Sequence, residues 1–261
     1  MTENARFPDH RKQQIKRRLQ AGQPVMSNDL AAEFAVSEDA IRRDLRALAA
    51  EGVCQRVYGG ALPISPASGP VGQRAGMQAA AKLALARCGS ALLGPGQTVF
   101  LDASSTNLLL TRFLPDGIRV VTNSVLIAAE MARNKAVEVN VLGGRINANL
   151  GGCVDAKAIS GLQDYCIDLC FLGACAFAPG EGLAGFDPDD VQFKRSLLRA
   201  ARASAVLLTT DKLNTLAPYR ICRPEDVGIY VLSGDAPQPI RAGLAALGCE
   251  TLIAEPAEEG A

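Results

Sequence analysis

The spacing of hydrophobic residues changes along this chain. In the first sixty or so residues, apolar positions recur at helical spacing, as in 35–52, where Ile41, Leu45 and Leu48 fall on one helical face. From about residue 97 onward, apolar runs of strand length alternate with further helical patterns. This change predicts two structural units, a small helical one followed by a larger one of mixed helix and strand.

Three helices are predicted in the first unit. Residues 8–21 form the first, with its basic side chains outward. Ser27 is the expected N-cap of a second short helix, 27–35. Ser37 is the expected N-cap of the third helix, which has acidic residues in its first turn and ends near Gly52. After it, 53–63 alternates and contains two consecutive glycines, which predicts a short hairpin.

The third helix carries an unusual density of arginine. Arg42, Arg43 and Arg46 lie on the faces that the apolar stripe leaves free. A solvated surface helix explains an arginine pair by itself. However, three helices with a tight turn before the third and a trailing hairpin form a winged helix-turn-helix pattern, with the helix-turn-helix at about 25–44. In that geometry the third helix enters the major groove, so the arginines are expected to contact DNA.

The second unit has α/β organisation. Apolar, β-rich runs occupy 97–102, 119–124, 137–144, 167–174, 204–211 and 227–233. Helical patterns occupy 77–92, 105–114, 125–134, 187–202 and 238–247. Strands alternating with helices predict a largely parallel sheet covered by helices. Residues rich in Pro, Gly and Ser separate the two units, so we divide the chain into a DNA-binding domain (1–63), a linker (64–75), an α/β domain (76–254) and a tail (255–261).

Composition narrows the functional classes. The formal net charge is zero, so the argument for DNA rests on local clusters. No stretch is long and apolar enough to cross a bilayer or to serve as a signal core, so we expect a cytoplasmic protein. The eight cysteines include no CxxC pair, and the group around Cys170 is better explained by core packing than by metal binding. With His10 as its single histidine, the chain has no Ser-His-Asp or Cys-His apparatus. No metal or cofactor is expected.

Small polar residues follow the first three predicted strands of the sheet. Asp102 and the next four residues end one strand and open a helix, and 122–124 repeats this arrangement one strand later. Plain helix capping explains such residues individually. Together with Gly143 and Gly144, which permit close backbone approach, they indicate a site for a small anionic ligand at the carboxyl ends of the strands.

The segment "VSEDAIRRDLRALAAEGVCQRVYGGA" resembles the N-terminal signature of the DeoR family of bacterial transcriptional regulators. Ala40 stands where that family usually has Thr, and Tyr58 where it usually has His. The loss of the threonine hydroxyl removes one candidate contact with DNA without affecting the fold. The candidate DNA-binding residues are Ser27, Asn28, Ser37, Glu38, Asp39, Ala40, Arg42, Arg43, Arg46, Arg56 and Tyr58.

The rest of the chain follows the order of the DeoR-family sensor domain, through "VFLDASST", "VVTNS", "VLGG", "FLGA", "FDPDDVQFKRSLL" and "VLLTTDK". The resemblance implies a fold similar to ribose-5-phosphate isomerase and binding of a phosphorylated sugar or related metabolite. The candidate effector-binding residues are Asp102, Ser104, Ser105, Thr106, Thr122, Asn123, Ser124, Gly143, Gly144, Lys194 and Lys212. The two lysines would balance the charge of a phosphate, and we expect the loss of Lys194 to weaken effector binding.

Two departures from the family pattern concern this site. Ser104 replaces a glycine of the family's Asp-Ala-Gly-Thr-Thr, which narrows backbone approach. Near Lys212 the family has Asp-x-Ser-Lys, whereas this chain has Thr209 at the Asp position and Asp211 at the Ser position. An acidic residue there would partly neutralise Lys212.

These patterns favour a DNA-binding regulator, a repressor of a carbohydrate-metabolism operon whose affinity for a double-stranded operator responds to a phosphorylated sugar. An activator of the same family is a weaker reading. The alternative from another class is a sugar-phosphate isomerase with an accessory DNA-binding domain, in which Asp102 or Asp187 would be the carboxylate base. We also expect a homo-oligomer, because DNA-binding dimers match paired half-sites with their own symmetry.

Overall fold

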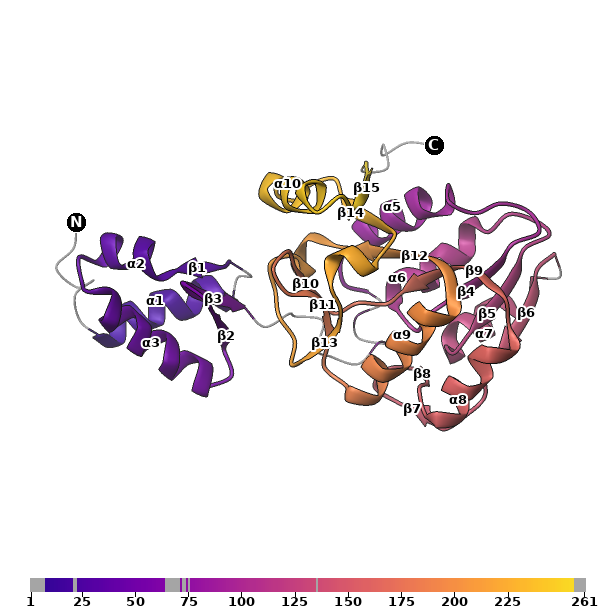
Figure 1. Ribbon diagram of the computed structural model, residues 1–261, viewed down its shortest axis with the longest axis horizontal. Helices are drawn as coiled ribbons and strands as arrows, with labels where there is room; N and C mark the ends of the chain where they lie inside the picture. Colours follow the sequence, from indigo (N-terminus) through magenta and orange to yellow (C-terminus); the bar gives the residue numbers. More distant parts are fainter. Residues whose placement is uncertain are drawn as a thin grey trace.

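The computed structural model describes residues 8–20, 23–63, 71, 74, 76–134 and 136–255. Figure 1 shows a small helical body at the N-terminal end, joined to a larger body built on a broad sheet. The residues that join the two bodies are those of the expected linker. Most of that segment, and the tail after residue 255, lie outside the described residues.

Three helices pack around one core in the small body. They are α1 (Pro8–Gln20), α2 (Ser27–Phe34) and α3 (Glu38–Ala50). The predicted apolar stripe of α3 is buried, together with apolar residues of α1 and α2. The side chain of Ser37 caps α3 by accepting a hydrogen bond from the Ala40 N–H at 3.3 Å, as predicted.

The wing is a three-stranded antiparallel sheet rather than a simple hairpin. It contains β1 (Val25–Met26), β2 (Cys54–Val57) and β3 (Gly60–Pro63), in the order β1-β3-β2. The predicted hairpin is confirmed, but β1 was not predicted. A strand of two residues has no periodicity that a sequence pattern can detect.

The wing also changes the start of α2. The Ser27 N–H donates to the Gly59 carbonyl at 2.7 Å, so Ser27 is the first helical residue and Met26 holds the N-cap position without a side-chain cap. The predicted Ser27 cap was therefore wrong. Gly59, with φ of 81°, makes the tight turn at the wing tip, a conformation that favours glycine.

A seven-stranded parallel sheet forms the larger body, in the order β15-β14-β12-β9-β4-β5-β6. Its strands are β4 (Thr98–Leu101), β5 (Arg119–Thr122), β6 (Glu138–Val141), β9 (Ile167–Leu172), β12 (Ala201–Leu208), β14 (Ile229–Ser233) and β15 (Glu250–Ala254). All six predicted strands are present, and β15 is an addition at the edge. From β4 the strand order runs to β5 and β6 on one side, and β9, β12, β14 and β15 then follow on the other side of β4. The direction of the order reverses between β4 and β9, so these two strands form the topological switch point.

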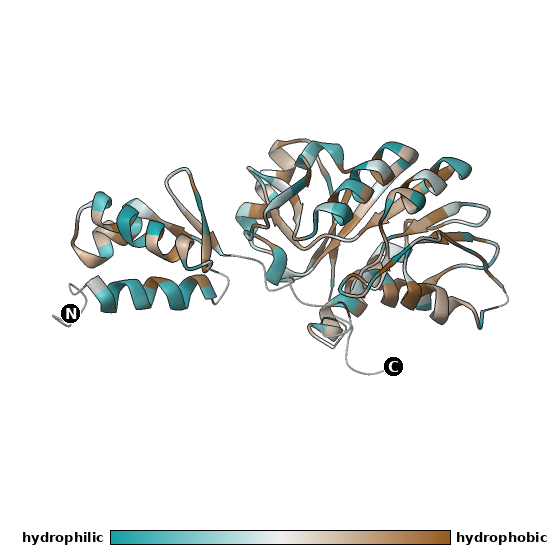
Figure 2. Ribbon diagram, turned by 90° about the horizontal axis from the view of Figure 1, so that it is seen from below, coloured by the Kyte–Doolittle hydropathy of each residue, from teal (hydrophilic) through white to brown (hydrophobic). Residues whose placement is uncertain are grey.

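Helices cover both faces of this sheet. One core joins it to α5 (Ala79–Ser90), α6 (Ser105–Leu110) and α7 (Val125–Met131), and the other to α8 (Ala156–Gly161), α9 (Pro188–Ala200) and α10 (Gln238–Ala246). In Figure 2 the strands are largely hydrophobic, while the helices carry hydrophilic residues along their outer surfaces. The predicted α/β fold with a parallel sheet is confirmed. Helix α9 ends two residues earlier than predicted, because Ala201 already begins β12.

Several short elements complete the larger body and were not predicted. They are α8, the hairpin of β7 (Ile146–Asn147) and β8 (Gly152–Cys153), and a small sheet of β10 (Ala176–Ala178), β11 (Gly182–Gly185) and β13 (Tyr219–Cys222). Short 3-10 turns include η5 (Thr210–Lys212), which follows β12. No helix among the described residues is long and apolar enough to span a membrane.

Candidate functional site

The outer face of α3 and the tip of the wing are open to solvent. Tyr58, at the wing tip, is fully exposed, with 104% relative exposure. The other exposed candidates for DNA contact are Asn28, Ser37, Glu38, Asp39, Arg42, Arg43, Arg46 and Arg56, with Ala40 partly buried. Ser27 is buried, so its side chain is a support beneath the wing rather than part of this surface.

The arginines of α3 have at most local partners. Arg42 pairs with Glu38 at 2.8 Å and with Asp39 at 3.4 Å, both one turn earlier on the same helix. The Arg43 Nε–H donates weakly to the Asp39 carbonyl at 3.4 Å. Exposed pairs of this kind contribute roughly 0–1 kcal/mol, so these guanidinium groups can turn toward a phosphate or a base edge at little cost.

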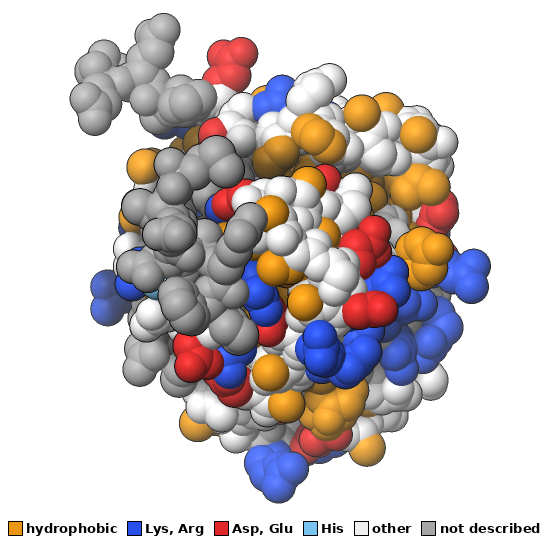
Figure 3. Space-filling model, turned by 90° about the vertical axis from the view of Figure 1, so that its left-hand side faces the viewer, with side chains coloured by type: hydrophobic (Ala, Val, Ile, Leu, Met, Phe, Trp, Pro, Cys, Tyr) orange, Lys and Arg blue, Asp and Glu red, His pale blue; other side chains and the backbone are white. Residues whose placement is uncertain are grey.

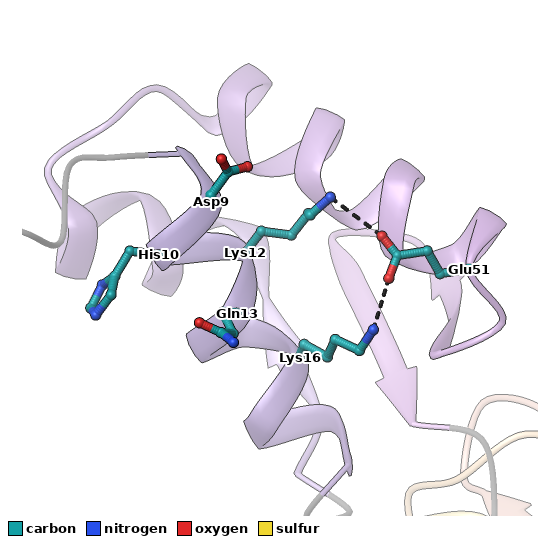
Figure 4. Close-up of a pocket in the computed structure, with 6 residues that line it drawn as sticks. All are labelled: Asp9, His10, Lys12, Gln13, Lys16 and Glu51. Atoms are coloured by element: carbon teal, nitrogen blue, oxygen red, sulfur yellow. Dashed lines mark hydrogen bonds and ion pairs between the residues drawn. The ribbon is translucent and has the colours of Figure 1, made fainter.

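Helix α1 uses its basic residues differently. Figure 4 shows Lys12 and Lys16 reaching across a cleft to the same carboxylate, Glu51, at 3.3 and 2.9 Å. Arg11 pairs with Asp44 of α3 at 2.6 Å in a largely buried contact, and Arg18 pairs with Glu33 of α2. The basic face of α1 therefore ties the three helices together. Its expected contribution to DNA contacts is reduced, because most of its charges have carboxylate partners.

Figure 3 looks at the molecule from the side of this small body. Lys and Arg side chains gather along one margin of the visible face, with Asp and Glu residues interspersed. Positive charge is therefore local rather than global, as the zero net charge of the chain requires.

In the larger body, the predicted site residue Asp102 lies at the switch point. Its carboxylate is fully buried and accepts hydrogen bonds from the N–H groups of Ala103, at 2.9 Å, and Gly173, at 2.8 Å. Gly173 follows β9, so this carboxylate joins the ends of the two central strands. A side chain at Gly173 would crowd Ser104, because an added Cβ would lie 2.9 Å from the Ser104 Cβ.

Lys194 completes this arrangement with charge. Its ammonium group is 2.9 Å from Asp102 Oδ2 and also pairs with Asp190, one turn earlier on α9. Burial alone would lower the pKa of Lys194, but the two carboxylates outweigh it and raise that pKa above its usual range. Lys194, expected to balance the charge of an effector, instead has its charge balanced by two carboxylates of the protein.

The other predicted strand ends also bond mainly to the protein itself. The Thr122 hydroxyl donates to the Leu101 carbonyl at 2.6 Å, and the Asn123 side chain links Ala103 to Cys153 at 3.0 and 3.2 Å. Ser104 and Ser124 cap α6 and α7, as the plain capping alternative predicted. These contacts hold the strand ends in register, which supports a site without supplying its ligands.

Gly144 makes a close approach, but to the protein. A Cβ at Gly144 would collide with the carboxylate of Asp155, which caps α8 and accepts a hydrogen bond from the Arg145 N–H at 2.9 Å. Gly143 has open space beside it. Gly144 therefore allows the chain after β6 to lie close to the start of α8. The sequence pattern had suggested a close approach to a ligand instead.

A small cavity lies at the carboxyl ends of β4 and β12. Its volume of about 10 Å³, measured for the centre of a water-sized sphere, is enough for about one water molecule, and it is partly open to solvent. The lining residues are Arg74, Met77, Lys82, Ser105, Thr209, Asp211 and Lys212. Two predicted residues, Ser105 and Lys212, are therefore brought together here. Thr106 is the next residue on α6, and its buried hydroxyl has no hydrogen-bond partner within the described chain.

Positive charge dominates this cavity. Among the described lining residues, Lys82 and Lys212 lie beside one carboxylate, Asp211, and Arg74 also forms part of the wall. Burial and the neighbouring Lys212 lower the pKa of Lys82 to about 8, and its ammonium group donates to the Arg74 carbonyl. Burial is also the main cause that lowers the pKa of Lys212. Burial disfavours the charged form of both lysines, and an anion bound beside them would favour that form.

Sequence reasoning missed Lys82 and Arg74. Lys82 had a detectable signal, because it shares a buried helical stripe with Leu85 and Gly89, at spacings of three and seven residues. A lysine on the apolar face of a helix requires a special environment. Arg74 lay in the expected linker, where no pattern distinguishes a site residue from a solvated one.

The two carboxylates considered as isomerase bases are both engaged. Asp102 is paired with Lys194, and Asp187 caps α9 while accepting a hydrogen bond from the Asn147 side chain at 2.9 Å. Neither carboxylate lines the cavity. Within the described ranges, no cluster of His, Cys, Asp and Glu has the geometry of a metal site, and Cys170 is buried in the core.

Known protein families match both bodies. The DeoR-like helix-turn-helix domain matches residues 11–67, and the DeoR C terminal sensor domain matches residues 77–233. The chain is 32% identical to the L-fucose operon activator of Escherichia coli K12 over 204 residues, which cover 76% of this chain and 84% of that protein. It is 26% identical to the glycerol-3-phosphate regulon repressor of the same strain over 220 residues, which cover 83% and 86%.

Among solved structures, a ribose 5-phosphate isomerase from Methanocaldococcus jannaschii overlaps with 51% of this chain and 53% of its own, at a TM-score of 0.37 and 16% identity. That overlap is too small to carry a functional argument. Both family matches and both relatives are of transcriptional regulators, and this decides against the isomerase alternative.

Proposed function

We propose that this chain, which belongs to the DeoR family of bacterial transcriptional regulators, represses an operon of carbohydrate metabolism and releases its operator when a phosphorylated sugar binds the sensor domain. The chain is a DNA-binding regulator by family. The sign of regulation and the class of effector are the parts that we add.

The exposed arginines of α3 support the DNA side of the proposal. Arg43 and Arg46 project from the helix that a winged helix-turn-helix inserts into the major groove, and Tyr58 and Arg56 project from the wing. Guanidinium groups there can bond bidentately to guanine or contact phosphates. We expect operator affinity to fall steeply with salt, because each phosphate contact releases counterions.

The observation that carries the effector proposal is the charge imbalance of the cavity. Two buried lysines, Lys82 and Lys212, line it beside Asp211, and burial lowers the pKa of both lysines, which an anion bound beside them would offset. A phosphate monoester carries nearly two negative charges at neutral pH. Ser105 stands at the start of α6, where a hydroxyl and backbone N–H groups favour an anion.

The cavity also suggests how the effector would act on DNA binding. The cavity itself holds about one water molecule, so a bound sugar phosphate would extend beyond it or displace part of its wall. Arg74 and Met77 in that wall belong to the chain that leads from the DNA-binding domain, and Leu216 of the sensor donates to the Pro63 carbonyl at 3.1 Å. An effector that prefers one arrangement of this wall would shift operator affinity by its differential binding.

A two-stage experiment tests the proposal. DNA duplexes selected by the purified protein provide an operator, and fluorescence anisotropy measures its release during titration with glycerol 3-phosphate, ribose 5-phosphate and glucose 6-phosphate. A specific effector also raises the thermal transition in a concentration-dependent way. Release of the operator supports a repressor, whereas tighter operator binding with the effector would indicate an activator, as the name of the L-fucose relative indicates for that protein.

Assembly is a further part of the proposal. One DNA-binding domain covers one half-site of an operator, so we propose a homo-oligomer held together through the sensor domain. Light scattering at micromolar concentration, with and without operator, measures the mass directly. A strict monomer in both conditions would contradict this part.

A further inference from the structure

The tip of the wing presents two large apolar side chains to solvent. Tyr58 is fully exposed, and Met26 of β1 is 45% exposed. Within the described residues 8–20 and 23–63, no other large hydrophobic side chain is exposed. The core of the small body covers its other large apolar side chains wholly or in part, so these two are exceptions that require an explanation.

Met26 and Tyr58 meet at the same turn of the chain. Met26 pairs with Gly60 across strands β1 and β3. A Cβ at Gly59 would lie 3.2 Å from the Met26 Cε, which places the end of that side chain against the hairpin turn. Tyr58 immediately precedes Gly59 in this turn. The two side chains therefore form one apolar surface, which we call the wing-tip pair.

The backbone beneath the wing-tip pair is anchored. The Ser27 N–H donates to the Gly59 carbonyl at 2.7 Å, which ties the turn to the start of α2. A Cβ at Gly60 would collide with the Val25 carbonyl oxygen, so β1 can lie this close to β3 only because Gly60 has no side chain. A contact surface that is already held in place loses less conformational entropy when it binds.

The wing-tip pair lies in an uncharged part of the wing. Residues 24–28 and 57–63 contain no Asp, Glu, Lys or Arg, whereas the exposed Arg56 on β2 is close enough in sequence to reach a phosphate beside the pair. The apolar atoms that a duplex exposes are thymine methyl groups, which face the major groove, and the carbon atoms of deoxyribose, which follow the backbone between the phosphates. Apolar side chains placed next to a phosphate contact therefore meet deoxyribose, as they do in proteins that bind the minor groove.

We propose that Met26 and Tyr58 pack against deoxyribose groups of the operator backbone and supply a part of the affinity that does not depend on charge. This inference rests on the proposed function, because it assumes that α3 and the wing bind the operator together. It assigns a role to Met26, which is not among the contact residues expected from the sequence. Burial of apolar surface releases no counterions, so its contribution should not depend on salt concentration.

The test compares affinity across a series of salt concentrations. Fluorescence anisotropy measures binding of the full chain to a duplex selected by the purified protein. Met26→Ala combined with Tyr58→Ala should weaken binding by about ten- to a hundredfold, because two apolar contacts are lost. The loss should be the same at each salt concentration, so the slope of log affinity against log salt should stay at its wild-type value.

Arg56→Ala is the matched control on the same wing. It should reduce the steepness of the salt dependence by about 0.9, the value for one phosphate contact. A similar change of slope in the Met26 and Tyr58 double variant would assign that pair to phosphate binding and would overturn the inference. Thermal melts check folding, and the transition of the double variant should hardly move because both side chains are exposed.

Conservative variants test whether apolar surface is what matters. Met26→Leu and Tyr58→Phe keep most of that surface and should bind the operator as the wild type does. If Tyr58→Phe loses as much affinity as Tyr58→Ala, the phenol hydroxyl makes the contact through a hydrogen bond and the inference is wrong.

A duplex with deoxyuridine in place of thymidine separates the two apolar parts of DNA, because it lacks the methyl groups and keeps the sugars. The double alanine variant should show its full loss on this duplex as well. Equal affinity of the variant and the wild type there would assign the contact to thymine methyl groups and contradict packing on deoxyribose.

Failure of this inference can be distinguished from failure of the proposed function. If the double alanine variant binds the operator as tightly as the wild type, while Arg42→Ala combined with Arg43→Ala abolishes binding, only the inference on the wing tip fails. If the wild-type chain selects no DNA sequence, the proposed function fails and this inference fails with it.

Discussion

The sensor domain buries two lysines in contrasting ways. Lys194 lies between Asp102 and Asp190, and both carboxylates hold its charge. Lys212 is buried almost as deeply, yet it lies beside Lys82 and forms no ion pair in the described part of the chain. The contrast teaches that burial does not identify a functional lysine. What distinguishes a binding site is positive charge that the protein leaves unbalanced.

The DNA-binding domain repeats this contrast at its surface. Most basic residues of α1 form ion pairs with carboxylates of the other helices or of the segment after α3, as in Arg11–Asp44. Those of α3 are exposed, and only Arg42 has carboxylate partners, both on its own helix. Cations with distant partners hold the fold together, and cations without them are available to a ligand.

The largest effect should come from the exposed arginines. Arg42→Ala combined with Arg43→Ala should weaken operator binding by about a hundred- to ten-thousandfold, because each specific base contact contributes about 1–3 kcal/mol. The thermal transition should hardly move, since exposed charges add little stability. Anisotropy titrations and thermal melts measure the two quantities.

Lys12→Ala combined with Lys16→Ala is the matched control. It removes the same number of positive charges from α1, where both lysines are half-buried and paired with Glu51. Operator affinity should change far less than in the α3 variant. An equal loss of operator affinity in the two double variants would show that paired and unpaired cations of this domain contribute alike to DNA binding.

The second effect is on stability. Lys194→Met leaves two buried carboxylates without a counter-charge, and breaking such a buried pair costs about 3–5 kcal/mol of unfolding free energy. Lys212→Met, in contrast, removes a buried cation without an ion-pair partner and should be neutral or stabilising. Urea unfolding followed by circular dichroism measures both. A comparable loss of unfolding free energy in the two variants would show that both lysines stabilise the fold through ion pairs.

The third effect is on effector affinity. Lys82→Met and Lys212→Met should each weaken sugar-phosphate binding by about ten- to a hundredfold, because a charge-assisted hydrogen bond is lost. Operator binding without effector should persist. The exposed Lys157 provides the control, since Lys157→Met removes a charge of the same domain outside the cavity. Calorimetry measures the sugar-phosphate affinity of all three variants. Wild-type affinity in either cavity variant would show that the phosphate binds elsewhere.

The smallest effect is a pH dependence. Effector affinity should rise as the phosphate loses its second proton near pH 6 and should fall again above pH 8, where Lys82, with its pKa of about 8, becomes neutral. The stability of the protein without effector depends on pH in the opposite direction. Between pH 8 and the ordinary value of 10.5 the unfolded chain binds more protons at this group, so the contribution of Lys82 to stability increases with pH.

Lys82→Arg separates these contributions, because arginine stays protonated throughout the accessible range. Its affinity profile should lose the decline above pH 8. A decline that persists in this variant would assign the titration to another group, such as Lys212.

Much of the architecture was predictable from local patterns. The six predicted strands, the helices between them and the arginine helix were all recognised, because each is marked in the sequence by a continuous apolar run or by helical spacing. The two-residue β1, the short α8 and the small sheet of β10, β11 and β13 were missed. Their conformation depends on partners rather than on periodicity.

The candidate site was predictable only in part. Asp102, Ser104 and Thr122 do end strands or cap helices where expected, since these roles are set by adjacent residues. Their hydrogen bonds, however, go to other strand ends. Lys82 and Arg74, which line the cavity with Lys212, lie well before the strand-end sequences that drew attention to the site.

Periodicity and capping act between residues a few positions apart, and they were enough to predict two structural units, the α/β fold class and the arginine-rich helix α3. Which charges are balanced depends instead on the tertiary structure. Asp102 and Lys194 are remote in sequence, as are Lys82 and Lys212, and the sheet order brings each pair together. Electrostatic interactions depend on distance in space and on burial, and neither quantity can be read from spacing along the chain.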